Sequence, residues 1–148
     1  MVVNDIDYRG GAGVQVHITE WATDSYFDLV VSRKVISRVD YKSIIRPDVE
    51  ILKPERGLPL QNVKFKKSSF WGPASSLGKT ISNGFKMKWH NFGSGKFQLR
   101  LCIGIIGAES FLCRAYVKDD KTEKREMAIF KIHMQRILNG KYTKRGVL

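Results

Sequence analysis

Cysteine is scarce in this sequence of 148 residues, which contains only Cys102 and Cys113. Two cysteines cannot supply a disulfide framework, and such sparing use is typical of a reducing, intracellular setting. Long apolar runs are also missing: the longest, LCIGIIGA, has 8 residues, whereas a membrane-spanning helix needs about 18 to 20. The start, MVVNDIDYRGG, has acids where a secretory signal peptide has basic residues and a long apolar core. We therefore expect a cytoplasmic or nucleoid-associated protein without a membrane segment.

Acidic side chains are scarce in the second part of the chain. Residues 1–62 hold 8 basic and 9 acidic side chains, whereas residues 63–148 hold 18 and 5, and the net charge of the whole is +12. So large an excess of one sign repels itself in a compact fold and is tolerated most easily when the partner is a polyanion. The charge therefore predicts nucleic acid as the partner, bound by the C-terminal part.

The length and the apolar content of 43% are sufficient for one folded domain with a real core. We expect a single domain over residues 1–148, within which three parts are possible. Residues 1–52 would form a near-neutral, β-rich lobe. The segment 53–62, KPERGLPLQN, has two prolines and a glycine and is interpreted as a joint. Residues 63–140 would form a basic unit of four strands and a helix.

The first lobe and the start of the basic unit contain segments typical of strands. Residues 14–19 alternate apolar and polar side chains, which predicts a strand. Residues 25–39 are rich in β-branched and aromatic side chains, and residues 41–53 are also expected to be extended, with a bend or an edge at Pro47. VKFKK, residues 63–67, alternates again and predicts the first strand of the basic unit.

The segment GFKMKWHNFGSGKFQLRLCIG, residues 84–104, predicts a hairpin with one apolar and one basic face. Met87 and Trp89 share one face of its first strand, because side chains alternate across the pleat, and Lys86 lies on the other face. The predicted register sets Trp89 opposite Phe97 and Lys86 opposite Arg100. A slip of one residue would mix the two faces, so the pattern itself favours this register.

A third strand of this sheet is expected at residues 110–118, after a short glycine-containing turn. Neighbouring strands joined in this way form an antiparallel meander. The predicted register places Cys102 and Cys113 on opposite faces of the sheet, which disfavours a disulfide between them. We therefore expect both cysteines to be free thiols.

A long helix is predicted at about residues 121–139. Apolar side chains recur there at spacings of three and four, and Asp120 with Glu123 is typical of a capping box. The apolar stripe of this helix needs a partner, and we expect it to cover the apolar face of the preceding sheet. The predicted fold class is therefore α+β: a mostly antiparallel β-sheet, a meander, with one long C-terminal helix packed on one face.

The other face of the sheet is the predicted binding surface. Like charges that share a sheet face do not favour folding, whereas basic side chains that neutralise phosphates release counterions and so favour binding. The lysines and arginines would contact phosphate, and Tyr116, His90 and Phe92 would stack on bases. The predicted nucleic-acid-binding residues are Lys64, Lys66, Lys86, Lys88, His90, Phe92, Arg100, Arg114, Tyr116 and Lys118.

The leading hypothesis is a non-catalytic nucleic-acid-binding protein that prefers single-stranded DNA or RNA, with limited sequence specificity. It needs no cofactor and no metal, and an edge strand could support a homo-oligomer. The order of elements over about 63–140 is similar to the half-unit of Whirly-type single-stranded DNA-binding domains. That resemblance implies the same preference for single strands.

Two other functions stay open. One is a protein-interaction or regulatory module, for instance encoded by a phage or mobile element, whose basic surface docks an acidic partner. The other is a metal-dependent nuclease, because Asp48 and Glu50 would share one face of the strand predicted at 41–53. A phosphate loop is excluded: Gly72 and Gly78 enclose five residues in WGPASSLGKT, where the pattern needs four.

Overall fold

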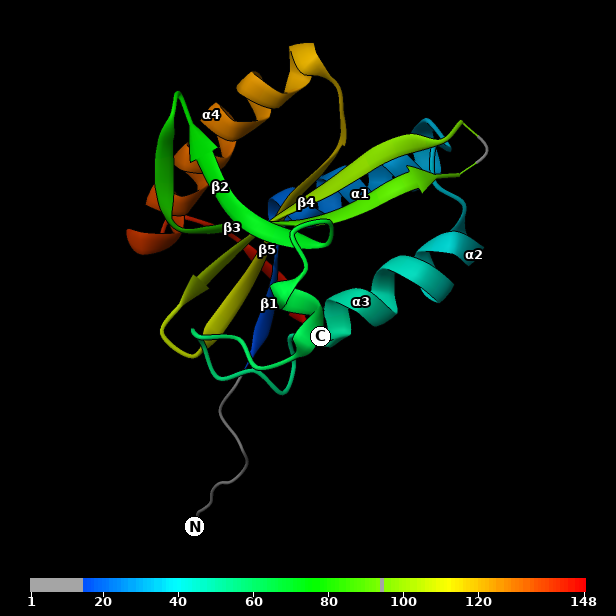
Figure 1. The fold of residues 1–148 in the computed structure, drawn as a ribbon. Helices are drawn as coiled ribbons and strands as arrows, with labels where there is room; N and C mark the ends of the chain where they lie inside the picture. Colours follow the sequence, from blue (N-terminus) through cyan, green and yellow to red (C-terminus); the bar gives the residue numbers. More distant parts are fainter. Residues whose placement is uncertain (1–14, 94) are drawn as a thin grey trace.

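The computed structural model describes residues 15–93 and 95–148 and has an α+β fold, as predicted. Its sheet has six strands in the order β2-β3-β4-β5-β1-β6 (Figure 1). The strands β2 to β5 form an antiparallel meander, of which β3, β4 and β5 were predicted and β2 was not, whereas β1 is parallel to β5 and antiparallel to β6. The strands are β1 (Val16–Thr19), β2 (Trp71–Ser76), β3 (Lys79–Phe92), β4 (Phe97–Ile106), β5 (Glu109–Lys118) and β6 (Lys144–Val147).

Most of the helical structure comes from segments of the first half of the chain, where the sequence predicted strands. The helices there are α1 (Glu20–Tyr26), η1 (Phe27–Ser32), α2 (Arg38–Asp40), η2 (Tyr41–Ile45), α3 (Arg46–Glu50) and η3 (Val63–Lys66), and the long helix α4 (Asp120–Leu138) follows β5. The predictions of extended structure at 25–39, 41–53 and 63–67 are therefore wrong. None of the helices among the described residues has both the length and the apolarity needed to cross a membrane.

The wrong strand predictions have a common physical reason. Burial in this region follows a helical spacing: Ile45, Val49 and Leu52 are buried and lie four and three residues apart. Packing of such a face against a sheet outweighs the weak β-preference of branched side chains. Pro47 does not interrupt the segment, because proline is tolerated in the first turn of a helix, where α3 has it.

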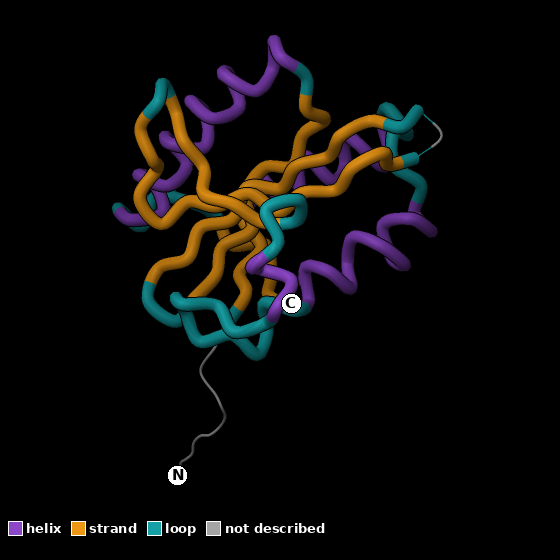
Figure 2. The backbone as a smooth tube through the Cα atoms, in the orientation of Figure 1, coloured by secondary structure: helices purple, strands orange, loops and turns teal. Residues whose placement is uncertain are grey.

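Helices cover both faces of the sheet, so the molecule has three layers (Figure 2). The N-terminal helices pack on the apolar face of β3 and β4, against Met87, Trp89 and Leu101. Helix α4 packs on the opposite face through Met127, Phe130, Met134 and Ile137, in a cluster that also holds Cys102. The prediction that α4 covers the apolar face was therefore wrong, because the N-terminal helices occupy that face.

Two glycines explain why α4 approaches the second face so closely. Gly84 and Gly104 are directly opposite each other on β3 and β4. A Cβ atom on Gly104 would lie 2.5 Å from Met134 Sδ, and one on Gly84 would lie 3.0 Å from Phe130 Cε2. The glycine pair therefore makes the depression in the sheet in which these two side chains of α4 lie.

The β3–β4 hairpin is offset by two residues from the predicted register. Trp89 lies opposite Leu99 and Lys88 lies opposite Arg100. An even offset keeps each side chain on its predicted face, because the period of a strand is two. A bulge between Trp89 and Phe92 then changes the face of Phe92, which stacks on the ring of Phe97 at 5.7 Å.

The segment 53–62 is a loop, and Gly57 holds it against the turn between β4 and β5. Gly57 has φ +86°, and a Cβ atom there would lie 2.1 Å from the carbonyl oxygen of Gly107. The buried carboxylate of Glu55 accepts hydrogen bonds from the backbone N–H groups of Gln61 at 2.6 Å and Asn62 at 3.0 Å. The loop is thus fixed by hydrogen bonds of its own and by close contact with the β4–β5 turn.

Both cysteines are free and buried beneath α4. The free thiols were predicted, but the placement on opposite faces was wrong, since Cys102 and Cys113 belong to the same cluster. A register shift between Leu101 and Ile103 in the β4–β5 pairing accounts for the error, because an added residue changes the face of those that follow it. Burial raises the pKa of both thiols well above the usual range.

Candidate functional site

Four basic side chains lie together on the α4 side of the sheet, beside the first turn of that helix. We call Lys86, Lys88, Arg100 and Lys118 the basic cluster. The pairing of the strands brings them together. Lys88 of β3 lies opposite Arg100 of β4. Lys118 of β5 lies opposite Gln98 of β4, two residues from Arg100. Burial lowers the pKa of Lys88, and the nearby positive charges of Lys86, Arg100 and Lys118 lower it further.

Arg100 is the most buried member of the basic cluster, with 5% of its surface exposed. One terminal nitrogen donates to the carbonyl oxygen of Leu99 at 3.1 Å, but Nε has no hydrogen-bond partner within the described chain. None of the acidic side chains in 15–93 and 95–148 forms an ion pair with Arg100. Burial lowers its pKa, yet a guanidinium stays charged in proteins. The centre of the basic cluster is thus a buried cation with unused donors.

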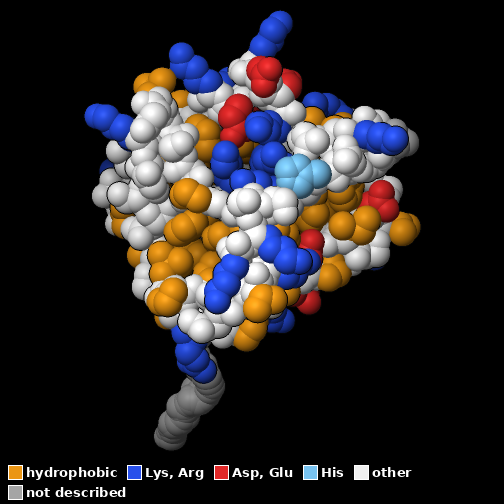
Figure 3. Space-filling view, in the orientation of Figure 1, with side chains coloured by type: hydrophobic (Ala, Val, Ile, Leu, Met, Phe, Trp, Pro, Cys, Tyr) orange, Lys and Arg blue, Asp and Glu red, His pale blue; other side chains and the backbone are white. Residues whose placement is uncertain are grey.

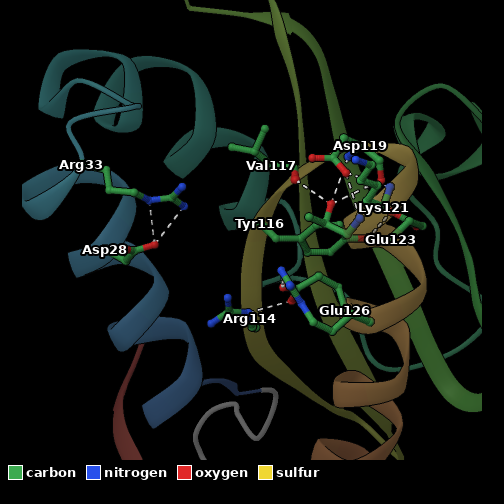
Figure 4. A network of polar contacts seen from close by, with 11 residues as sticks. Asp28, Arg33, Arg114, Tyr116, Val117, Asp119, Lys121, Glu123 and Glu126 are labelled. Atoms are coloured by element: carbon green, nitrogen blue, oxygen red, sulfur yellow. Dashed lines mark hydrogen bonds and ion pairs between the residues drawn. The ribbon is translucent and has the colours of Figure 1, made fainter.

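Glu123 of α4 supplies the acidic side chain beside the basic cluster, through its contact with Lys86. Figure 4 shows Glu123 next to Tyr116 of β5. Glu123 accepts hydrogen bonds from Lys86 Nζ at 2.8 Å and from the Tyr116 hydroxyl at 2.8 Å. Burial raises the pKa of Glu123, but these two hydrogen bonds, together with the charges of Lys86 and Lys118, hold the pKa below its usual range. One of the four basic side chains is therefore neutralised by α4.

A shift of one residue at the start of α4 places Glu123 there. The N-cap is Asp119, whose side chain accepts from the backbone N–H groups of Lys121 and Thr122, and Thr122 completes the capping box. The predicted box of Asp120 with Glu123 was wrong, and Glu123 is free to turn towards the sheet. The sequence analysis missed Glu123 as a functional residue because the capping prediction had already given it another role.

Lys88 and Lys118 are half-buried and have no ion pair with any acidic side chain in the described part of the chain. Lys88 Nζ donates to the carbonyl oxygen of Ser68 at 2.9 Å and passes over Gly72, where a Cβ atom would lie 3.2 Å from that nitrogen. These two lysines carry the net positive charge at the surface of the basic cluster.

A hollow of about 540 Å³ adjoins the basic cluster between the β2–β3 turn and the first turn of α4. It is lined by Lys86, Lys118 and Lys124, with Asp120 and Glu123 on the helix side. Figure 3 shows lysine and arginine side chains gathered in front of the sheet, with acidic side chains bordering them on one side. The site is thus a recessed, mostly cationic surface and not the flat, uncovered sheet face that was predicted.

Arg114 does not belong to the basic cluster. Its Nε donates to Glu126 Oε1 at 2.7 Å, and Glu126 is buried on α4 (Figure 4). The interpretation of Arg114 as a free phosphate contact is corrected, because a buried carboxylate on the covering helix already neutralises it. The sequence analysis did not assign Glu126 any role.

Two of the three predicted base-stacking residues are buried. Tyr116 is 3% exposed beneath α4, and Phe92 is 5% exposed on the opposite face of the sheet. Neither ring can be reached by a base in this conformation, so both assignments are corrected. His90 is exposed, but its ring nitrogens contact Gln98 Oε1 at 2.6 Å and the carbonyl oxygen of Ser69 at 2.6 Å.

Lys64 and Lys66 lie on η3, away from the basic cluster. Lys64 Nζ binds Asp48 and lies 4.7 Å from the ring centroid of Phe70, whereas Lys66 is exposed. The predicted strand at 63–67 would have placed these lysines beside those of β3. The 3₁₀ turn instead puts Lys64 against α3, on the side of the N-terminal helices.

The pair of carboxylates predicted as a nuclease centre is not assembled. Asp48 accepts a hydrogen bond from Trp89 Nε1 at 2.8 Å besides its ion pair with Lys64, and Glu50 pairs with Arg46 at 2.9 Å. Both lie on α3 and not on a strand. Across residues 15–93 and 95–148 no group of three His, Cys, Asp or Glu side chains could hold a metal ion. Asp48 is therefore a structural residue that orients Trp89.

Comparisons with known proteins add no relatives to this picture. No protein-family model matches the chain, and neither the curated proteins nor the solved structures give a match. The geometry of the basic cluster is therefore the basis for a functional conclusion.

Proposed function

We propose that the protein binds nucleic acid without catalysis, through phosphate contacts at the basic cluster, in the cytoplasm or the nucleoid. The observation that carries this proposal is the pair Lys88 and Lys118: both are half-buried, both lack an ion pair among the described residues, and both lie beside the buried guanidinium of Arg100. Arg100 is itself too buried for direct contact, and Glu123 offsets its charge only from beyond ion-pair distance, so the like charges of the cluster remain costly to the folded state. A phosphate bound by Lys88 and Lys118 would supply a counterion close to Arg100.

The arrangement of charge also supports a polyanion over a single small anion. Lys88 and Lys118 flank Arg100 on the neighbouring strands, and Lys124 continues the positive surface along α4. The charge of +12 for the chain adds attraction over a longer range. Successive phosphates of one strand can follow such a line of cations, and each contact releases counterions.

Single strands remain the preferred form in this proposal, for a reason that differs from base stacking. Tyr116 and Phe92 are buried, so stacking does not contribute. Lys86, Lys118 and Lys124 line a recess beside α4, which adjoins Lys88 and Arg100. A flexible single strand can follow the recess, whereas a rigid duplex would contact its rim alone. The expected affinity depends on phosphates, so sequence preference is limited.

The test is a fluorescence anisotropy titration with a labelled single strand and the matching duplex at several salt concentrations. The variant K88Q/K118Q should weaken single-strand binding about tenfold or more at low salt. It should also reduce the slope of log K against log salt by about 1.4, which is two contacts at about 0.7 each. The control K131Q/K144Q removes the same charge from two exposed lysines elsewhere and should leave both quantities near the wild-type values.

Equal binding by K88Q/K118Q and the wild type, at unchanged melting temperature, would contradict the proposal. A protein partner is the other possible result. Affinity capture before and after nuclease digestion distinguishes the two, because a partner that survives digestion would be an acidic protein docked on the same surface. A homo-oligomer through an edge strand also stays a prediction; among the described residues the edges of the sheet are β2 and β6.

A further inference from the structure

A cavity of about 380 Å³ lies between the N-terminal helices and the apolar face of the sheet. Its walls include Trp89, Leu99 and Leu101 from the sheet and Leu29 and Val49 from the helices. Protein interiors rarely contain empty spaces much larger than a water molecule. This cavity is more than twice the size of an engineered cavity of about 150 Å³ that binds benzene, and it falls within the range of ligand pockets.

Two π-helical turns form the helical wall of the cavity. The N–H of Arg33 reaches back five residues to the carbonyl of Asp28 at the end of η1, and that of Arg46 reaches the carbonyl of Tyr41 at the end of η2. Such widened turns are rare in proteins and frequently occur at functional sites. Both turns contribute lining residues, Leu29 from η1 and Ile45 from η2. The wall is thus built from backbone that does not follow the regular helical path.

The charged groups of the cavity lie on η2 and the start of α3. They are the ammonium of Lys42 and the guanidinium of Arg46, beside the Tyr41 hydroxyl, whereas Thr23 and Ser25 add polar groups from α1. Lys42 is exposed and Arg46 is half-exposed, so this end is the mouth. Burial raises the pKa of Tyr41, which keeps its hydroxyl protonated and able to donate. Arg46 is paired with Glu50 beside the lining, whereas Lys42 has no ion pair among the described residues, so Lys42 supplies the net positive charge that makes the mouth complementary to an anion.

We propose that this cavity binds a medium-chain fatty acid, with its alkyl tail against the leucines of the sheet and its carboxylate at Tyr41, Lys42 and Arg46. The apolar walls favour a hydrocarbon tail, because burying each CH₂ group away from water is favourable. The cationic mouth selects a carboxylate over a neutral head group. Arg46 is held at the mouth by Glu50, through Nε at 2.9 Å, and by a hydrogen bond with the Tyr41 hydroxyl, so Lys42 is the main contact for the carboxylate.

This proposal is independent of nucleic-acid binding, because the cavity and the basic cluster lie on opposite faces of the sheet. The experiment is isothermal titration of the full chain with decanoate and, separately, with 1-decanol. Ala22 lines the cavity, so A22L should fill part of the space and weaken decanoate binding at least tenfold. The same change should keep or raise the melting temperature, because filling a cavity is stabilising. The control A128L makes the same substitution at an exposed position of α4 and should leave decanoate binding unchanged.

A second variant tests the head-group contacts. K42Q/R46Q should weaken decanoate binding at least tenfold while 1-decanol binding stays at the wild-type value. No decanoate binding by the wild type, or equal binding by A22L and the wild type, would overturn the proposal. Equal losses for decanoate and 1-decanol in K42Q/R46Q would overturn the assignment of the carboxylate to the mouth.

Discussion

Gly84 lies directly opposite Gly104 on adjacent strands, and the side chains of Phe130 and Met134 occupy the space that two Cβ atoms would fill. This relationship decides which face of the sheet receives α4. It also decides that the basic cluster lies at the first turn of that helix and not on an uncovered surface. The arrangement of the candidate site therefore depends on two residues that carry no side chain.

Replacing Gly104 by valine should reduce the free energy of unfolding by about 2–3 kcal/mol, because the added methyl groups collide with Met134 in a packed layer. Urea denaturation followed by circular dichroism measures this change. Gly95 has nothing within 4 Å of an added Cβ, so G95V is the control and should change stability by less than about 0.5 kcal/mol. Equal effects of the two substitutions would show that α4 does not depend on the glycine pair.

Gly57 should be even less tolerant of a side chain. The Cβ of G57A would lie 2.1 Å from a backbone carbonyl oxygen, and the residue has φ +86°. We expect a loss of about 2–4 kcal/mol in the free energy of unfolding, because neither the backbone contact nor the left-handed conformation can relax easily. The variant G78A separates the effect of the left-handed conformation from that of the backbone contact, because Gly78 has φ +78° but free space around it. G78A should reduce the free energy of unfolding by about 1–2 kcal/mol. Similar losses in both variants would mean that the contact with Gly107 is unimportant.

Glu123 should limit nucleic-acid binding while it stabilises the fold. The variant E123Q frees Lys86 and adds one positive charge at the basic cluster. Single-strand affinity should therefore rise, and the salt slope should increase by about 0.7. The free energy of unfolding should fall by about 1–2 kcal/mol, because Lys86 and Tyr116 lose a charged acceptor. D24N makes the same change in net charge at an exposed position of α1 and serves as the control for general charge effects. Weaker binding by E123Q would contradict the placement of the site.

His133 should make the fold sensitive to acid. It stacks on Trp21 at 3.8 Å, and burial, with Arg114 and Arg136 nearby, lowers its pKa to about 4. The unfolded chain takes up this proton near the ordinary value of about 6.5, so it gains protons before the folded state does. The contribution of His133 to stability is therefore complete above about pH 6.5 and is lost as the pH falls towards 4.

The corresponding experiment compares denaturant unfolding of the wild type and H133Q at pH 7 and pH 5. The wild type should lose about 1–2 kcal/mol more than H133Q over this interval, because glutamine does not titrate. Parallel losses in the two proteins would assign the acid sensitivity to other groups. The fluorescence of Trp21 provides a second measure, since the ring lies against the imidazole.

The two thiols should be unreactive in the native state. Burial raises the pKa of Cys102 and Cys113, and the thiolate is the reactive form. We expect Ellman's reagent at pH 8 to modify neither cysteine within minutes and both after addition of guanidinium chloride. Rapid modification of the native protein would mean that α4 opens readily from the sheet.

The sequence predicted the meander and the long C-terminal helix because both have strong periodic patterns. Met87 and Trp89 alternate with lysines, and Met127, Phe130 and Met134 follow helical spacing. The register within the hairpin could not be obtained to the residue, because a shift of two preserves every face. In the sequence, the bulge before Phe92 is visible only as a break in the alternation of apolar and polar side chains.

The candidate site was predicted in part. Lys86, Lys88, Arg100 and Lys118 do lie on one face, as the alternation in β3, β4 and β5 indicated. The predicted face for α4 was wrong, because the N-terminal segments had been interpreted as strands and so offered no second cover for the sheet. The acids that neutralise Lys86 and Arg114 lie on that helix, 37 and 12 residues further along the chain. Tertiary packing, and not local pattern, decides such pairs.

The position of β1 has a consequence for how the protein is made. Its neighbours in the sheet are β5, where Val16 pairs with Ser110, and β6, where His17 pairs with Val147. On the ribosome this strand emerges first, and it finds no partner until residues near 110 and then near 147 have been synthesised. Contacts between such distant segments slow folding, so β1 stays unpaired while the strands that lie between it and its partners in the chain are synthesised.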